Sequence, residues 1–270
     1  GCPPMHGSSD PPSENALIDT MPDASVPAIR VQSVTKSYGA IRAVTGLSFD
    51  LPRGGVCGLV GSDGAGKTTL LRMVATMIPP DSGTIRVNGK DVIGERHLVK
   101  EMIGYMPQRF GLYTDLTVSE NFDFFMDIYG VSGAERPQRR DRYLGFSNLL
   151  PFLDRRAGDL SGGMKQKLGL ACVLVHEPKV LILDEPTTGV DPVSRSEFWE
   201  ILSQMRGMGK TILVSTAYLD EGEKCDRLIL LHDGCILADA TPREIRGGHT
   251  DLEEAIIQRI QSMAHPPEVR

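Results

Sequence analysis

Hydrophobic and polar positions along this chain alternate between short apolar runs and longer segments with helical spacing. Two of the apolar runs, VLILD at 180–184 and TILVS at 211–215, end in an acidic or small polar residue. Short apolar strands separated by helices are typical of a parallel sheet that is covered on both faces. The pattern predicts an α/β fold, and we find no internal repeat. Short β-like runs precede them from Ala28 onward and read AIRVQSV, LSFDL, VCGLV and TIRVNG.

The beginning of the chain lacks this periodicity. Residues 1–27 are rich in Pro, Ser, Asp and Gly, a composition that buries too little apolar surface to fold. We expect a disordered leader there, partly an expression remnant because position 1 is not Met, with Met5 or Met21 as the natural start. The rest of the chain is long enough for one large α/β domain or for a core with a smaller insert.

Composition excludes several classes of protein. A net charge of −6 argues against a protein that coats nucleic acid, and the arginines at 136–140 and Arg142 are interpreted as a solvated helix face. Apolar runs such as LGLACVLV at 168–175 are far shorter than the roughly 20 residues that span a bilayer. The five cysteines form no CxxC pair, which favours reduced, cytosolic thiols.

A phosphate-binding loop follows the apolar run VCGLV. The segment GSDGAGKTT at 61–69 fits G-x-x-x-x-G-K-[ST], whose glycines let backbone N–H groups point at a phosphate. A helix expected at 68–76 adds its positive N-terminal end. We expect Lys67 to bridge the β- and γ-phosphates and the Thr68 hydroxyl to bind Mg²⁺. An ordinary glycine-rich turn is the alternative, but strand, loop, Lys-Thr and helix all agree with the motif. The nucleotide-binding residues expected here are Gly61, Ser62, Asp63, Gly64, Ala65, Gly66, Lys67, Thr68 and Thr69.

The second acidic element is VLILDEPTTGVDP at 180–192. Its apolar residues place Asp184 at the carboxyl end of a buried strand, where a carboxylate is costly unless it faces a cation such as Mg²⁺. Glu185 can orient or deprotonate a water that attacks the γ-phosphate. An isolated Asp-Glu pair is more often a plain loop-edge pair. Together with the phosphate loop, this pair indicates a nucleotide-hydrolysing site.

Between these two elements, LSGGMKQK at 160–167 begins a helical pattern. Ser161 is a good N-cap, and the glycines after it leave backbone N–H groups open for an anion. In this order and spacing the segment resembles the signature of the ATP-binding-cassette (ABC) ATPases, and the resemblance extends from Ala28 to about Arg246. It implies a P-loop NTPase (RecA-like) parallel sheet core with an antiparallel β subdomain and an inserted helical subdomain.

The resemblance also implies a domain division and a dimer. The ABC ATPase domain is expected at 28–250, its helical subdomain at about 112–159 with the aromatics of NFDFFMDIYG in its core, and a C-terminal helix and tail at 251–270. The dimer is head-to-tail, with the signature of one subunit against the ATP of the other. The signature residues expected to touch that γ-phosphate are Ser161, Gly162 and Gly163.

Further residues receive roles from the same resemblance. Tyr38 stands where an aromatic side chain stacks on adenine, although a lone Tyr before Gly is otherwise a turn residue. Gln108 matches the glutamine that reaches Mg²⁺ and the attacking water, in a loop that couples the site to a membrane partner. Asp191 belongs to the loop that crosses the dimer interface. Val190 replaces the commoner Leu in that loop, and Ser62 with Asp63 replace the commoner Pro-Asn.

The segments QRFGLYTDLTVSEN, LSGGMKQKLGLAC, GVDPVSR and STAYLDEGEKCDR are similar to motor subunits of bacterial exporters of drugs or other hydrophobic compounds. This implies an ATP hydrolase that uses ATP and Mg²⁺ and lies peripherally at the cytoplasmic face of the cell membrane. Its partners would be integral membrane subunits and a second ABC subunit, identical or different, with no nucleic acid.

The alternative is a soluble ABC ATPase that is not coupled to a membrane channel. Soluble ABC proteins of DNA repair carry a long coiled coil between the phosphate loop and the signature. The interval from Lys67 to Ser161 has no room for one. Soluble ABC proteins that act in translation carry two cassettes in one chain, whereas this sequence contains one. A P-loop kinase does not explain the signature segment.

One expected side chain is missing. Ala217 stands in TAYLDE, where the family usually has a histidine that hydrogen-bonds the γ-phosphate and helps to hold Glu185 and the water in line. His176 and His232 are too far along in the family's order to replace it, and Tyr218 would have to turn inward from the start of a helix. We therefore expect a site that binds ATP well and hydrolyses it slowly on its own, as in the weaker half of an asymmetric pair.

Overall fold

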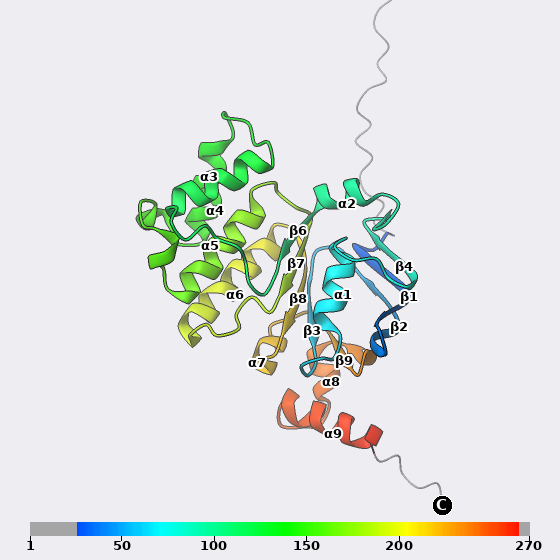
Figure 1. Ribbon diagram of the computed structural model, residues 1–270. Helices are drawn as coiled ribbons and strands as arrows, with labels where there is room; N and C mark the ends of the chain where they lie inside the picture. The colour runs from blue at the N-terminus through cyan, green and yellow to red at the C-terminus, as the bar shows by residue number, and fades with distance from the viewer. Residues whose placement is uncertain (1–25, 265–270) are drawn as a thin grey trace, which may run out of the picture.

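A six-stranded sheet forms the centre of the molecule in the computed structural model, which describes residues 26–264 (Figure 1). Residues 1–25 of the expected leader at 1–27, and residues 265–270 of the expected C-terminal helix and tail at 251–270, lie outside the described residues. The strand order is β10-β9-β3-β8-β7-β6. All pairs are parallel except β9 with β10. The strands are β3 (Val56–Val60), β6 (Ile103–Met106), β7 (Val180–Asp184), β8 (Thr211–Thr216), β9 (Arg227–His232) and β10 (Cys235–Ala240).

The central strands β3, β7 and β8 are buried at every position, which explains their unbroken apolar sequences. Their register brings polar residues together at one edge. Asp184 at the end of β7 lies opposite Ser215 of β8, and Val60 at the end of β3 lies opposite Thr216. Because parallel strands present their carboxyl ends at the same edge, the phosphate loop after β3 and the acidic pair after β7 emerge at one edge of the sheet, with the end of β8 between them.

A second, antiparallel sheet with the order β2-β1-β4-β5 packs beside the first. Helix α1 (Lys67–Val74) lies between the two sheets, and its apolar side chains share one core with both of them (Figure 1). The predicted α/β fold with an antiparallel β part is thus confirmed. The expected end of this helix at Thr76 is wrong, because Thr76 adopts a positive φ of 62°. The strands of the second sheet are β1 (Ile29–Tyr38), β2 (Ile41–Leu51), β4 (Ser82–Val87) and β5 (Lys90–Asp91).

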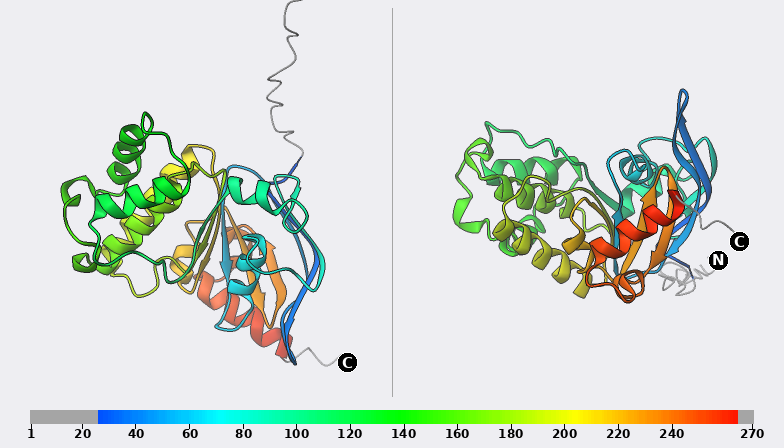
Figure 2. Two further views of the ribbon diagram at one scale, coloured as in Figure 1. Left: turned by 45° about the horizontal axis from the view of Figure 1, so that its top comes forward. Right: turned by 90° about the horizontal axis from the view of Figure 1, so that it is seen from below.

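Helices cover the opposite face of the central sheet and form a lobe on that side (Figure 2). Within 112–159, only Phe122 of the predicted core aromatics is fully buried, whereas Tyr129 is 45% exposed. The arginines of α4 form ion pairs with acidic side chains such as Asp123 and Glu177, which refines their interpretation as a solvated face. The elements of the lobe are α3 (Val118–Ile128), α4 (Arg136–Phe146), η1 (Leu150–Phe152), η2 (Ala157–Asp159), α5 (Gly162–Leu174) and α6 (Pro192–Gly207).

Four further helices complete the described chain. Helix α2 (Arg96–Met102) leads into β6, and α7 (Leu219–Gly222) follows β8. Helices α8 (Pro242–Arg246) and α9 (Leu252–Ala264) follow the last strand and pack against each other. Leu252 and Ile256 of α9 are buried in the same core as the helical lobe. None of the helices within residues 26–264 is both long and apolar enough to cross a membrane.

Candidate active site

A cavity of about 500 Å³ opens where the loop after β3 meets the beginnings of α1 and β2. The backbone of this loop requires glycine at two places. Gly66 has a φ of 102°, and a Cβ there would lie 2.3 Å from the carbonyl oxygen of Ala43; at Gly61 it would lie 2.4 Å from that of Leu231. The predicted residues that line the cavity are Tyr38, Asp63, Gly64, Ala65, Gly66, Lys67, Thr68, Thr69, Gln108 and Glu185.

Lys67 is the cation of this cavity. Its ammonium group is buried, with 5% of the side chain exposed, and donates hydrogen bonds to the carbonyl oxygens of Gly61 at 2.7 Å and Ser62 at 3.1 Å. The same nitrogen lies 3.5 Å from Oε1 of Glu185. An ammonium group in a water-poor loop attracts anions more strongly than one in bulk water. The loop therefore presents a positive charge beside backbone N–H groups, which suits a phosphate.

Asp184 is 2% exposed and contacts Thr68 of the cavity wall without lining the cavity itself. One of its oxygens, Oδ1, accepts hydrogen bonds from the hydroxyls of Thr68 at 3.1 Å and Ser215 at 2.9 Å. Among the described residues Asp184 has no ion-pair partner, so its buried charge is balanced only by hydroxyl dipoles. Carboxylate and hydroxyl oxygens are donors that suit Mg²⁺. These residues fit such an ion, with Asp184 and Thr68 as the groups that would hold it.

Glu185 follows directly and adopts a positive φ of 46°, which is unusual for a residue with a side chain. Its N–H donates to the Ser215 hydroxyl at 2.9 Å. Oε2 of Glu185 accepts hydrogen bonds from the Gln108 amide at 3.0 Å and from the Thr188 hydroxyl at 3.3 Å. The carboxylate is therefore turned into the cavity toward Lys67 and is oriented from two sides. An oriented carboxylate that faces the cavity has the chemistry of a general base.

The signature residues lie elsewhere and do not line this cavity. Ser161 caps α5 by accepting a hydrogen bond from the N–H of Met164 at 3.2 Å, and both Ser161 and Gly162 are exposed. Asp191 is also exposed and caps α6 by accepting from the N–H of Ser194 at 2.9 Å. Hydrogen bonds from the backbone N–H and the hydroxyl of Ser194 hold the pKa of the Asp191 carboxyl below its usual value. Within one chain, the predicted site residues thus form two separate groups.

A family model described as ABC transporter matches residues 44–188, more than half of the chain. The chain belongs to the ABC transporter family. It is 52% identical over 203 residues to the probable multidrug ABC transporter ATP-binding protein YbhF of Escherichia coli strain K12, which covers 75% of this chain but 35% of YbhF. It thus spans about a third of that relative. It is 40% identical over 222 residues to the Nod factor export ATP-binding protein I of Ralstonia nicotianae, which covers 82% of this chain and 69% of that protein.

A solved structure of an ABC cassette agrees with the fold. The dimeric cassette MJ0796, described in a post-hydrolysis state bound to ADP and Pi, superposes with a TM-score of 0.71 at 25% identity. The superposition covers 79% of this chain and 98% of that chain. This cassette therefore shares the arrangement of sheets and helices described above.

Ala217, where the resemblance led us to expect a histidine, is exposed immediately after β8 and carries no polar group. Neither alternative histidine lines the cavity. The ring of His176 stacks on Tyr129, and its Nε2 lies 2.8 Å from the carbonyl oxygen of Ile103. His232 ends β9 beside Asp233. Among the described residues, then, no histidine takes the place expected near position 217.

The Ser215 hydroxyl and the Glu221 carboxylate were not among the site residues predicted from the sequence. The Ser215 hydroxyl bonds both Asp184 and the backbone of Glu185. A small polar residue at the end of a buried strand was its signal. The buried carboxylate of Glu221 also lies near this edge of the sheet, and nothing in its acidic amphipathic segment distinguished it from its neighbour Asp220.

Proposed function

We propose that this chain is the nucleotide-binding motor subunit of an ABC transporter, which binds and hydrolyses ATP to drive export of a hydrophobic compound or drug. The cavity that joins Lys67 and Thr68 to Gln108 and Glu185 carries the proposal. It combines a phosphate-binding loop, an oriented carboxylate and a half-exposed aromatic, Tyr38, at the rim. Few other functions require these groups in one place.

In the proposed reaction, Tyr38 stacks on adenine and the loop at 61–69 holds the phosphates through its N–H groups and Lys67. Glu185, oriented by Gln108 and Thr188, accepts a proton from the attacking water. Asp184, Thr68 and Gln108 would hold Mg²⁺, which neutralises charge on the β- and γ-phosphates when it is bound. The ammonium group of Lys67 stays beside the phosphates and stabilises the charge that develops on them.

Three exposed residues, Ser161, Gly162 and Asp191, support a head-to-tail dimer, and Gly163 lies buried directly behind them in the first turn of α5. A capped helix end with open N–H groups suits an anion, yet it lies outside the chain's own cavity. A second cassette would bring its ATP to this surface. The MJ0796 cassette is described as dimeric. The partner here is either a second copy of this chain or a different cassette.

Transport requires integral membrane subunits, which we propose hold this chain at the cytoplasmic face of the membrane. The names of the two relatives, multidrug ABC transporter and Nod factor export, favour an exporter over a soluble ABC ATPase without a channel. Steady-state ATPase activity should rise when the membrane subunits are co-purified with the chain. An ATPase that never associates with membrane subunits supports the soluble alternative, and a chain that does not bind ATP contradicts the proposal.

A further inference from the structure

Glu221 is a carboxylate buried outside the nucleotide cavity, with 1% of the residue exposed. The hydroxyl of Thr187 lies 2.8 and 3.0 Å from its two oxygens, and the hydroxyl of Thr216 donates to Oε2. Arg195 donates from Nε to Oε1 at 3.0 Å. We call these four residues the Glu221 network. A buried carboxylate with this many donors is well satisfied, so its contacts are strongly directional.

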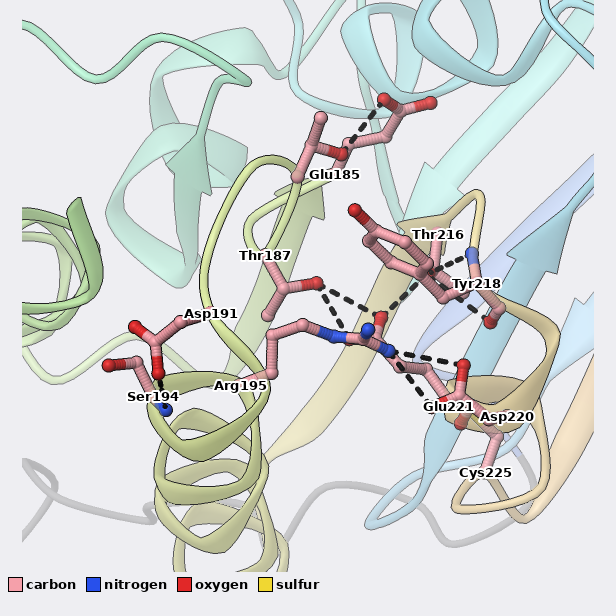
Figure 3. A network of polar contacts seen from close by, with 11 residues as sticks. Glu185, Thr187, Asp191, Ser194, Arg195, Thr216, Tyr218, Asp220, Glu221 and Cys225 are labelled. Carbon is pink, nitrogen blue, oxygen red and sulfur yellow. Dashed lines mark hydrogen bonds and ion pairs between the residues drawn. The ribbon is translucent and has the colours of Figure 1, made fainter.

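The Glu221 network joins three segments that are distant in sequence (Figure 3). Thr187 belongs to the loop after Glu185, Arg195 to the first turn of α6, and Thr216 to the end of β8. Asp191, expected at the dimer interface, caps the same turn of α6. The loop of Thr187 carries Glu185 itself, and β8 lies between the strands that lead into the phosphate loop and the acidic pair. One buried carboxylate therefore fixes the relative positions of the three segments.

Arg195 is held on two further sides. Its guanidinium carbon lies 3.8 Å from the ring centroid of Tyr218, and Nη2 donates to Asp220. Burial alone would lower the pKa of Arg195, but the hydrogen bond and charge of Glu221 and the charge of Asp220 raise it. The two carboxylates differ sharply, because Asp220 is 71% exposed and Glu221 is 1% exposed. An ion pair at the surface contributes little free energy, so we expect Glu221 to hold Arg195 in place more strongly than Asp220 does.

A continuous set of contacts runs from Glu221 to the proposed base. Thr187 is anchored on Glu221, and its neighbour Thr188 donates its hydroxyl to Glu185 at 3.3 Å. Glu185 has a positive φ, a conformation that persists only where surrounding contacts enforce it. On the other side, Thr216 accepts a hydrogen bond from the N–H of Tyr218, so both neighbours of Ala217 are tied to the same network.

We propose that Arg195 and Glu221 are positioning residues that hold the loop of Glu185 in its catalytic conformation and fix it relative to Asp191. This inference rests on the proposed ATPase function. The Glu221 network would then supply some of the alignment of Glu185 and the attacking water that Ala217, without a polar group, cannot provide. Neither residue lines the nucleotide cavity, so their effect falls on the hydrolysis step and not on ATP affinity.

The first test compares two neighbouring carboxylates on the same arginine. Glu221→Gln removes the buried charge, whereas Asp220→Asn removes the exposed one. With the chain in excess over MgATP, we expect Glu221→Gln to slow single-turnover hydrolysis by roughly 10- to 100-fold, because a small misplacement of catalytic groups has effects of this size. Asp220→Asn should stay within about twofold. ATP affinity by calorimetry should change by less than about threefold in both.

A second pair of variants separates positioning from folding. Thr187→Val keeps the ion pair of Arg195 and Glu221 and removes only the hydrogen bond from the hydroxyl of residue 187 to Glu221. Thr187→Ser keeps a hydroxyl at this position. We expect Thr187→Val to slow hydrolysis by roughly 10-fold, with Thr187→Ser much closer to the unchanged chain. If Glu221→Gln acts only by lowering stability, thermal unfolding shifts but Thr187→Val hydrolyses ATP at the normal rate. That result would overturn the proposal.

A double substitution tests whether the network acts through Glu185. Residues that act as a unit are strongly non-additive, so adding Glu221→Gln to Glu185→Gln should slow hydrolysis little further. Full additivity of the two effects would contradict the inference. Failure of the unchanged chain to bind ATP would overturn the proposed function itself. Normal hydrolysis by a folded Glu221→Gln variant, with ATP binding intact, would overturn only the positioning role.

Discussion

The Lys67 ammonium group, buried in the phosphate loop, donates to two backbone carbonyls and has one hydrogen left for a ligand. Lys67→Ala should remove a charge-assisted contact to phosphate, which is worth on the order of 2–5 kcal/mol of binding free energy. Calorimetry with MgATP measures this loss. Lys100→Ala, on the exposed surface of α2, is the matched control and should leave affinity unchanged. Equal affinities in all three proteins would show that the loop does not bind phosphate.

Also at the residue scale, Ala217 can be converted to histidine, the side chain that the resemblance led us to expect there. One preorganised donor to a transferring phosphoryl group typically contributes about 10²–10³ in rate. We expect Ala217→His to raise steady-state ATPase activity substantially, whereas Ala217→Leu, which adds bulk without a donor, should not. Binding through Lys67 should be the same in both. Rapid turnover by the unchanged chain, with no gain from the histidine, would contradict the prediction that the missing histidine slows hydrolysis.

At the scale of elements, the start of α5 is held by its contact with α6. A Cβ on Gly163 would lie 2.3 Å from Cβ of Ser194, whereas one on Gly162 would meet nothing within 4 Å. Gly163→Ala should therefore lower the free energy of unfolding by about 1–3 kcal/mol through overpacking. Gly162→Ala should leave it unchanged or raise it by up to about 1 kcal/mol, because Ala favours helix.

Urea unfolding without nucleotide measures both effects on the single chain. Neither glycine lines the chain's own cavity, so ATP binding to the isolated chain serves as the check that each variant is folded. Equal stability of the two variants would mean that α5 moves freely relative to α6. The signature residues would then lack the fixed platform that a contact across a dimer needs.

At the scale of the whole molecule, blocking hydrolysis should stabilise the proposed dimer. Glu185→Gln keeps the shape of the side chain but cannot accept a proton, so ATP should bind and persist. With ATP and Mg²⁺, size-exclusion chromatography should then show dimers, and with ADP it should show monomers. Monomers under both conditions, despite bound ATP, would indicate that the natural partner is a different cassette. Asp191→Ala in the same background should weaken the dimer without changing ATP affinity.

Contiguous motifs were the part of this protein that the sequence could predict. The loop at 61–69 and the acidic pair at 184–185 depend on local spacing, and each follows a strand whose apolar run is easy to recognise. Local spacing determines which groups leave the end of a strand, so the residues around the cavity and the parallel sheet were predictable. The end of α1 was missed because Thr76 leaves the helix through a positive φ that its sequence does not require.

Contacts between elements were decided only by the tertiary structure. Gln108 meets Glu185, the Ser215 hydroxyl meets Asp184, and Glu221 collects donors from three segments. Each of these depends on strand register and helix packing, which bring together residues far apart in the chain. Burial has the same origin: Asp220 and Glu221 are adjacent acids in the sequence, and only the packing of α6 and α7 on the sheet makes one of them a buried charge.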